Sequence, residues 1–130
     1  MLPVTDVSFY SHWVATISWL WVAAGVSAIA LVPLSLWAVY AGLRIAPLGY
    51  DSAVLWLQQP LNTVLAVLFA ALSFYHMGMG LRVVIEDYIH RRSTLIALLL
   101  LNTFVWWGMG VATVVALLKI ALATQVGALV

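Results

Sequence analysis

The fold is decided by the uncharged stretch from Ser52 to Leu81, which reads SAVLWLQQPLNTVLAVLFAALSFYHMGMGL. These 30 residues contain no Lys, Arg, Asp or Glu, and a transmembrane helix needs only about 20 predominantly apolar residues. His76 lies near the end of the stretch, and an ionisable side chain inside a membrane span is by default a functional site whose partner must be named. The stretch therefore predicts a membrane-spanning helix that carries one chemically active group.

The whole chain has the composition of an integral membrane protein. Of its 130 residues, 66% are hydrophobic and 7% are charged, whereas about a quarter of the residues of a soluble domain are charged. The mean hydropathy is +1.15. At 1.5 Å per residue and about 30 Å of hydrocarbon, this length allows three spans with short connections and no additional soluble domain.

Charge and cysteine content restrict the partners and cofactors. The formal net charge of +1 creates no large basic or acidic field, so nucleic acid is not expected as a partner. Cysteine is absent, which excludes disulfides, iron–sulfur ligation and thiolate haem ligation from this chain. Any cofactor must be held by imidazole or by noncovalent contacts.

Three apolar blocks predict three transmembrane helices within a single domain, residues 1–130. We expect the spans at about 13–40, 60–84 and 94–118. Pro33 should kink the first span, and Pro60 suits the first position of the second, where a missing N–H costs nothing. The charged segment from Glu86 to Ser93 is expected to be a short turn. The predicted fold class is an all-α membrane protein with three transmembrane helices.

The distribution of positive charge predicts the topology. Three spans put the N-terminus and the second connection on one side of the membrane. That side holds Arg82, Arg91 and Arg92, whereas the other holds Arg44 and Lys119. Because cytoplasmic connections carry the excess of Lys and Arg, we expect a cytoplasmic N-terminus, with the second connection on the same side.

If the second span is helical as far as Asp87, then His76 and Asp87 share one helix face, about 16 Å apart, with Gly80 and Val83 between them. A glycine one turn after His76 leaves a flat space that a planar macrocycle can occupy. Alternatively, His76 bonds a carbonyl or a Ser/Asn side chain of a neighbouring helix, and Gly78 and Gly80 only let helices approach. Periodicity does not decide between these readings. A b-type haem with two imidazole ligands would take the second from another subunit, because this chain has one histidine within a span.

The residues around His76 resemble a known family. Residues 74–90 read FYHMGMGLRVVIEDYIH, which combines an intramembrane histidine, a glycine shortly after it and a closing VIEDYIH. This run closely resembles the small hydrophobic membrane anchor subunits of succinate dehydrogenase, the cytochrome b portion of respiratory complex II. Residues 27–37, SAIALVPLSLW, are similar to the first span of that family. With the three-span layout, the resemblance covers most of the chain.

The resemblance implies a role for each polar residue in this run. His76 matches the axial ligand of haem b, whose iron takes its other axial histidine from the larger cytochrome b anchor subunit. Tyr88 matches a tyrosine that donates a hydrogen bond to the quinone, and Asp87 matches the acid of the quinone pocket and its proton supply. The family usually has an arginine near a haem propionate where residues 24–26 here read AGV, so Arg82 or the partner subunit would have to compensate.

The resemblance also implies the function. The chain would form half of a heterodimeric haem-binding anchor bundle and pass electrons from the iron–sulfur subunit to ubiquinone or another quinone, as a subunit of an enzyme whose remaining chemistry lies elsewhere. Its partners would be the larger cytochrome b anchor subunit, the iron–sulfur subunit, the flavoprotein subunit and the lipid membrane, in the bacterial inner (cytoplasmic) membrane. Two alternatives stay open: the anchor of a quinol:fumarate reductase, and a cofactor-free structural membrane subunit, in which Tyr88 would be an interfacial aromatic.

Overall fold

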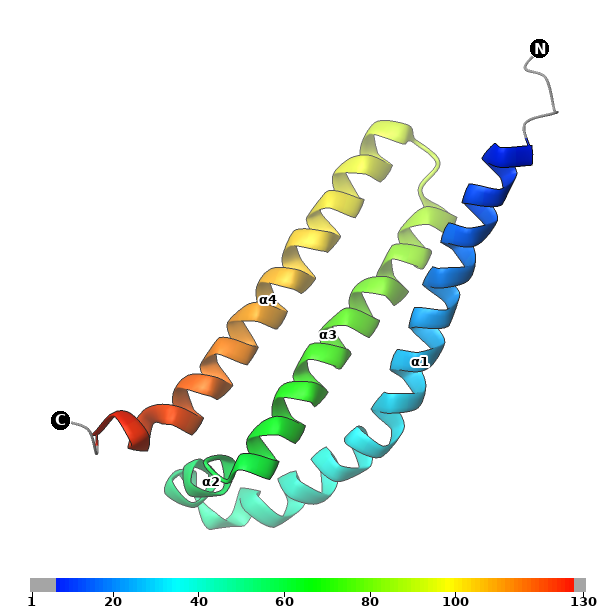
Figure 1. The fold of residues 1–130 in the computed structure, drawn as a ribbon. Helices are drawn as coiled ribbons and strands as arrows, with labels where there is room; N and C mark the ends of the chain where they lie inside the picture. The colour runs from blue at the N-terminus through cyan, green and yellow to red at the C-terminus, as the bar shows by residue number, and fades with distance from the viewer. Residues whose placement is uncertain (1–6, 128–130) are drawn as a thin grey trace.

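The computed structural model describes residues 7–127 as three long helices with a short helical connection. The elements are α1 (Val7–Ile45), the 3-10 turn η1 (Ala46–Leu48), α2 (Tyr50–Leu57), α3 (Pro60–Tyr88) and α4 (Arg92–Gly127). The long helices alternate in direction, and α2 lies at the end of the bundle opposite the turn between α3 and α4 (Figure 1). No strand occurs in the described part, and the all-α membrane class predicted from the sequence is confirmed.

Within residues 7–127, three helical segments are long and apolar enough to cross a membrane, as predicted. They are Trp21–Leu48, Pro60–Tyr88 and Arg92–Ala123. The second begins at Pro60, as expected for a residue without a backbone N–H. The single domain predicted over residues 1–130 stays a prediction. Residues 1–6 and 128–130 lie outside the described part, so the predicted side of the N-terminus falls outside it as well.

Two predicted boundaries are wrong. The connection between the first two spans is largely helical, because α1 continues to Ile45 and α2 follows; the chain turns at Gly49, whose φ of 82° favours glycine. The turn predicted from Glu86 to Ser93 is also shorter, since α3 continues through Tyr88 and α4 begins at Arg92. The i,i+4 pair of Arg82 with Glu86, 2.8 Å apart, supports the helix in the last turns of α3.

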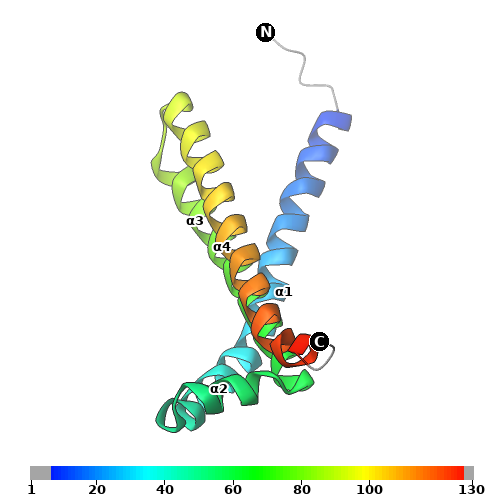
Figure 2. The same ribbon diagram turned by 90° about the vertical axis from the view of Figure 1, so that its left-hand side faces the viewer.

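The helices do not pack evenly. α3 and α4 run side by side, whereas the N-terminal half of α1 diverges from both (Figure 2). The direction of α1 changes around the part of the chain that contains Pro33 (Figures 1 and 2), as expected for a proline inside a helix. As a result, α1 contacts α3 mainly in its C-terminal part.

Glycine and aromatic residues fit reciprocally between α3 and α4. A Cβ atom on Gly78 would lie 3.2 Å from Cβ of Trp106, and one on Gly110 would lie 3.3 Å from Cβ of Phe74. The Phe74 and Trp106 rings lie 6.1 Å apart between these glycines. Asn102 adds a hydrogen bond from Nδ2 to the Gly78 carbonyl, at 2.9 Å. Small residues and side-chain hydrogen bonds are the usual means by which membrane helices pack.

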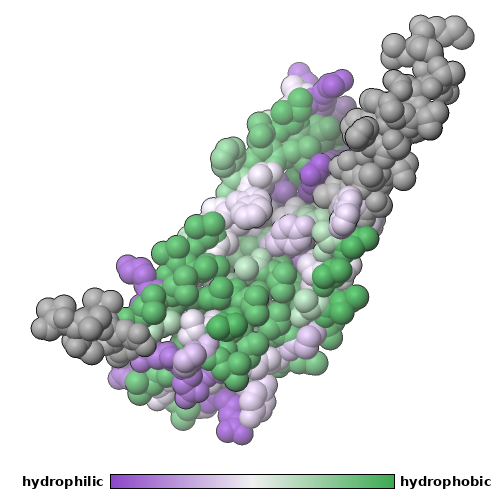
Figure 3. Space-filling model, in the orientation of Figure 1, coloured by the Kyte–Doolittle hydropathy of each residue, from purple (hydrophilic) through white to green (hydrophobic). Residues whose placement is uncertain are grey.

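The buried side chains are small or polar. Among the residues whose side chains are described, Ala41 and Ala70 are the buried hydrophobic ones, and Ser27, Asn62 and Asn102 are the buried polar ones. The large apolar side chains point outward instead, so that much of the surface in Figure 3 is hydrophobic, with hydrophilic residues gathered toward the ends. The chain therefore presents apolar faces to lipid or to other subunits.

Candidate functional site

His76 is held at the contact between α3 and α1. Its Nδ1 atom lies 3.0 Å from Oγ of Ser27, which is 3% exposed, and the same Oγ donates to the Ala24 carbonyl at 2.9 Å. The bend of α1 and its contact with α3 bring these two side chains together across 49 residues of sequence. The intramembrane histidine is thus oriented by a neighbouring helix.

The imidazole also borders a groove of about 420 Å³ along α1. The other residues that line this groove are Ala28, Leu31, Val32, Ser35, Leu36 and Val39. The lining is apolar apart from His76 and Ser35. A hydrophobic groove with one imidazole at its edge suits an apolar ligand that needs a single nitrogen donor.

The hydrogen bond to Ser27 bears on the two readings of His76 left open by the sequence. His76 does bond a serine of a neighbouring helix, as the purely structural reading requires. However, imidazole has two ring nitrogens, and this bond engages only Nδ1. The described side chains provide no hydrogen-bond partner for Nε2. Both readings therefore remain compatible with the geometry.

The helix face that contains His76 is open beyond the imidazole. A Cβ atom on Gly80 would have no heavy atom within 4 Å, so packing within the described part of the chain does not require a glycine there. Because α3 is helical through Tyr88, His76 and Asp87 do share one face, about 16 Å apart along the axis. Among the described side chains, none fills the space beside Gly80, one turn from the imidazole.

Asp87 and Tyr88 occupy the last turn of α3. Both are exposed, and the exposed fraction of Tyr88 is 77%. Tyr88 lies about 100° further around the helix than Asp87, so the two side chains leave the helix in different directions. They form an accessible polar pair at the end of the bundle that holds the α3–α4 turn.

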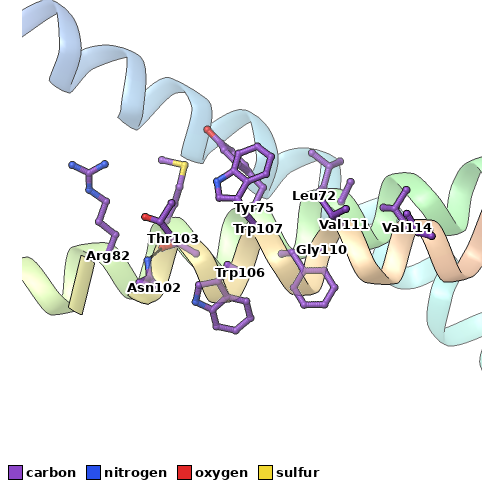
Figure 4. Close-up of a pocket in the computed structure, with 15 residues that line it drawn as sticks. Leu72, Tyr75, Arg82, Asn102, Thr103, Trp106, Trp107, Gly110, Val111 and Val114 are labelled. Atoms are coloured by element: carbon purple, nitrogen blue, oxygen red, sulfur yellow. Dashed lines mark hydrogen bonds between the residues drawn. The ribbon is translucent and has the colours of Figure 1, made fainter. Parts of the chain in front are cut away.

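Arg82 lies on a different side of α3 from His76. It borders the pocket of about 620 Å³ between α3 and α4 (Figure 4), and its Nε donates to Glu86. Six residues of helix rotate the chain by about 600°, which puts Arg82 about 120° away from His76 around the axis. Its predicted role beside a haem propionate stays a prediction, without support from this arrangement.

Two features of the site were not identified from the sequence. The first is that Ser27, within an apolar block, is the serine that bonds His76. The second is the pocket between α3 and α4, bordered by Asn102, Trp106 and Trp107 and shown in Figure 4. Periodicity marks faces of single helices but does not say which faces meet, so neither contact was readable. The described residues hold no cluster of three or more His, Asp or Glu side chains that would bind a metal by protein ligands alone.

The fold and this site define a class of protein: a three-span helical membrane protein with one imidazole at an intramembrane groove and a polar pair at one helix end. Residues 6–123 match the family model of the succinate dehydrogenase/fumarate reductase transmembrane subunit. This match extends over most of the chain. The chain therefore belongs to this family.

Curated relatives agree with the family match. The chain is 39% identical over 80 residues to the succinate dehydrogenase hydrophobic membrane anchor subunit of Rickettsia conorii; the match takes in 58% of this chain and 64% of that protein. It is 36% identical over 81 residues to the protein of the same name from Rickettsia felis, covering 60% of this chain and 68% of the relative. The matched region thus spans a little under two thirds of the R. conorii protein. No solved structure matches the chain.

Proposed function

We propose that this chain is the hydrophobic membrane anchor subunit of a succinate dehydrogenase, and that His76 is an axial ligand of a haem b shared with a larger cytochrome b anchor subunit. The position of His76, an imidazole at an apolar groove within a membrane-spanning helix, carries this proposal. The family match and the names of the Rickettsia relatives support membership of the complex.

The residues around His76 fit a haem. One ring nitrogen is engaged by Ser27, which leaves the other for the iron. Gly80, one turn further along α3, has open space beside it, and the groove lining is apolar. When bound, the haem would supply one-electron transfer. His76 would hold the iron, and the α1 side chains would exclude water from one side of the macrocycle.

We assign the quinone site to the end of α3. Quinone reduction takes two electrons and two protons, so it needs a hydrogen-bond donor for a quinone oxygen and a proton path from water. The exposed Tyr88 phenol would donate to the carbonyl, and the neighbouring Asp87 carboxylate would pass protons inward. The iron–sulfur subunit would cover this end and deliver the electrons, and the flavoprotein subunit would oxidise succinate.

We also propose a membrane location for the chain and a direction for the reaction of its complex. The chain would sit in the bacterial inner membrane with the α3–α4 turn on the cytoplasmic side, since Arg91 lies in that turn and Arg92 begins α4. The family description includes fumarate reductase as well, and an anchor working in that reverse direction is the second candidate. We favour succinate oxidation because the relatives reported above are named after succinate dehydrogenase.

The His76 assignment is tested by His76→Leu in the complex purified from membranes. Leucine keeps the span apolar, so the anchor should still insert, whereas the b-type absorption spectrum should be lost or severely disturbed. His90→Leu is the matched control: His90 is exposed in the turn after α3, and the spectrum should be unchanged. An unaltered low-spin haem spectrum in His76→Leu would overturn the assignment.

A further inference from the structure

We infer that Ser27 is a positioning residue for His76: it fixes the tautomer in which Nδ1 carries the proton and the lone pair of Nε2 is free for a metal. This inference rests on the proposed role of His76 as a haem ligand. It adds a residue of α1 to the site, one that acts through the imidazole and does not itself touch the iron.

The argument begins with the single proton of the Ser27 hydroxyl. That proton is donated to the Ala24 carbonyl over 2.9 Å. The same oxygen lies 3.0 Å from Nδ1 of His76, and a hydroxyl has one proton to donate and lone pairs with which to accept. With its proton engaged by Ala24, Ser27 must accept from the imidazole. The bonds then form a chain from Nδ1–H of His76 to Oγ–H of Ser27 and on to the Ala24 carbonyl.

The other tautomer satisfies fewer groups. If the proton were on Nε2, Ser27 would have to turn its hydroxyl toward Nδ1 and give up the bond to Ala24. The Nε2–H group would then need an acceptor, but the groove lined by Ala28, Leu31 and Val32 offers it apolar side chains. An unpaired N–H in an apolar environment is costly, and chains of hydrogen bonds strengthen one another. The buried position of Ser27, 3% exposed, shields this chain from water.

The tautomer has two consequences for a metal at Nε2. First, the lone pair is available without a proton transfer, and the ring is held at a fixed angle. Second, a hydrogen bond donated by Nδ1–H increases electron donation from Nε2, which stabilises ferric over ferrous iron. Loss of the bond should therefore raise the midpoint potential of the haem and weaken its binding, by about 10- to 100-fold for a typical outer partner of a metal ligand.

The test compares Ser27→Thr with Ser27→Val in the purified complex. Threonine and valine have nearly the same shape, but only threonine keeps the hydroxyl. We expect the valine variant to lose haem b more readily on dilution and to raise its midpoint potential, whereas the threonine variant matches the wild type. Ser27→Ala repeats the loss with a smaller side chain. Thr113→Val, which removes a hydroxyl that donates to the Met109 carbonyl within α4 and lies outside this groove, controls for the loss of a helix hydroxyl.

The outcomes separate this inference from the proposed function. If the threonine and valine variants both kept haem and midpoint potential at the wild-type values, the proposed role of the hydroxyl would be overturned. If both lost haem alike, Ser27 would act through packing, which also overturns it. An unchanged spectrum in His76→Leu would instead remove the haem ligand itself, and with it the proposed function of His76.

Discussion

Tyr50 is a suitable control position for Tyr88, because both side chains are 77% exposed and they lie at opposite ends of the bundle. Tyr88→Phe keeps the ring but deletes one hydrogen-bond donor. Such a loss typically costs about 0.5–1.5 kcal/mol, and more when a buried partner is left unpaired. We expect quinone reductase activity to fall roughly tenfold or more, since about 1.4 kcal/mol corresponds to a factor of ten. Steady-state rates with a soluble quinone analogue measure this.

Two controls define what that result means. Tyr50→Phe should leave the quinone reductase rate unchanged. Succinate oxidation measured with an artificial acceptor that takes electrons from the flavoprotein should survive Tyr88→Phe, because that route does not pass through this chain. Equal loss in both assays would mean that Tyr88 supports assembly, and wild-type rates in both would make it an interfacial aromatic.

The role of a single residue could be predicted where its type is unusual for its segment. It could not be predicted where the role depends on a contact with a second helix. His76 stands out as the histidine of an uncharged span, and its position at a groove edge fits that prominence. Ser27 is one serine in an apolar block, and its importance depends on how α1 is rotated against α3. Arg82 shows the same limit, since its charge suggested a propionate partner while the fold directs it toward α4 and Glu86.

At the scale of the helix, Gly80 and Gly108 provide a matched pair. Each lies within a long helix, and a Cβ atom at either position would meet nothing within 4 Å. If a macrocycle lies against Gly80, then Gly80→Val should reduce the haem b content per complex severalfold because the side chain occupies that space. Gly108→Val, on α4, should leave it unchanged. The absorption spectrum per assembled complex is the measurement, and equal haem in both variants would contradict a macrocycle at Gly80.

Hydropathy predicted the existence of the three long helices but not their ends. The transfer of apolar side chains into lipid acts over a whole span, whereas a boundary depends on a few local hydrogen bonds. α2 was missed because its eight residues, Tyr50–Leu57, are too few to produce a strong periodic signal among the polar residues of that connection. Its place is set by contacts such as the stacking of Trp56 on Trp37, with ring centroids 5.6 Å apart.

For the whole molecule, the orientation in the membrane can be tested directly because the chain has no cysteine. A cysteine at Ser93 should react with a membrane-impermeant thiol reagent only when the cytoplasmic face is accessible, because the arginines beside it favour that side. A cysteine at Asp51, at the opposite end of the bundle, should be labelled in intact cells. Labelling at Ser93 in intact cells would reverse the topology and put the proposed quinone site on the side of the membrane away from the proposed soluble subunits.

The scarcity of buried apolar side chains in the described region has a consequence for the life of the protein in the cell. Only alanines fill the apolar interior there, so contacts within the described part bury little apolar surface, and in the proposed complex lipid and partner subunits would supply most of the free energy that keeps this chain in one shape. Copies made in excess of the proposed partners would remain unassembled, with an open groove beside His76. Quality-control proteases of the membrane would degrade these copies. Matched synthesis of the subunits, more than the strength of any internal contact, would set how much of this chain accumulates.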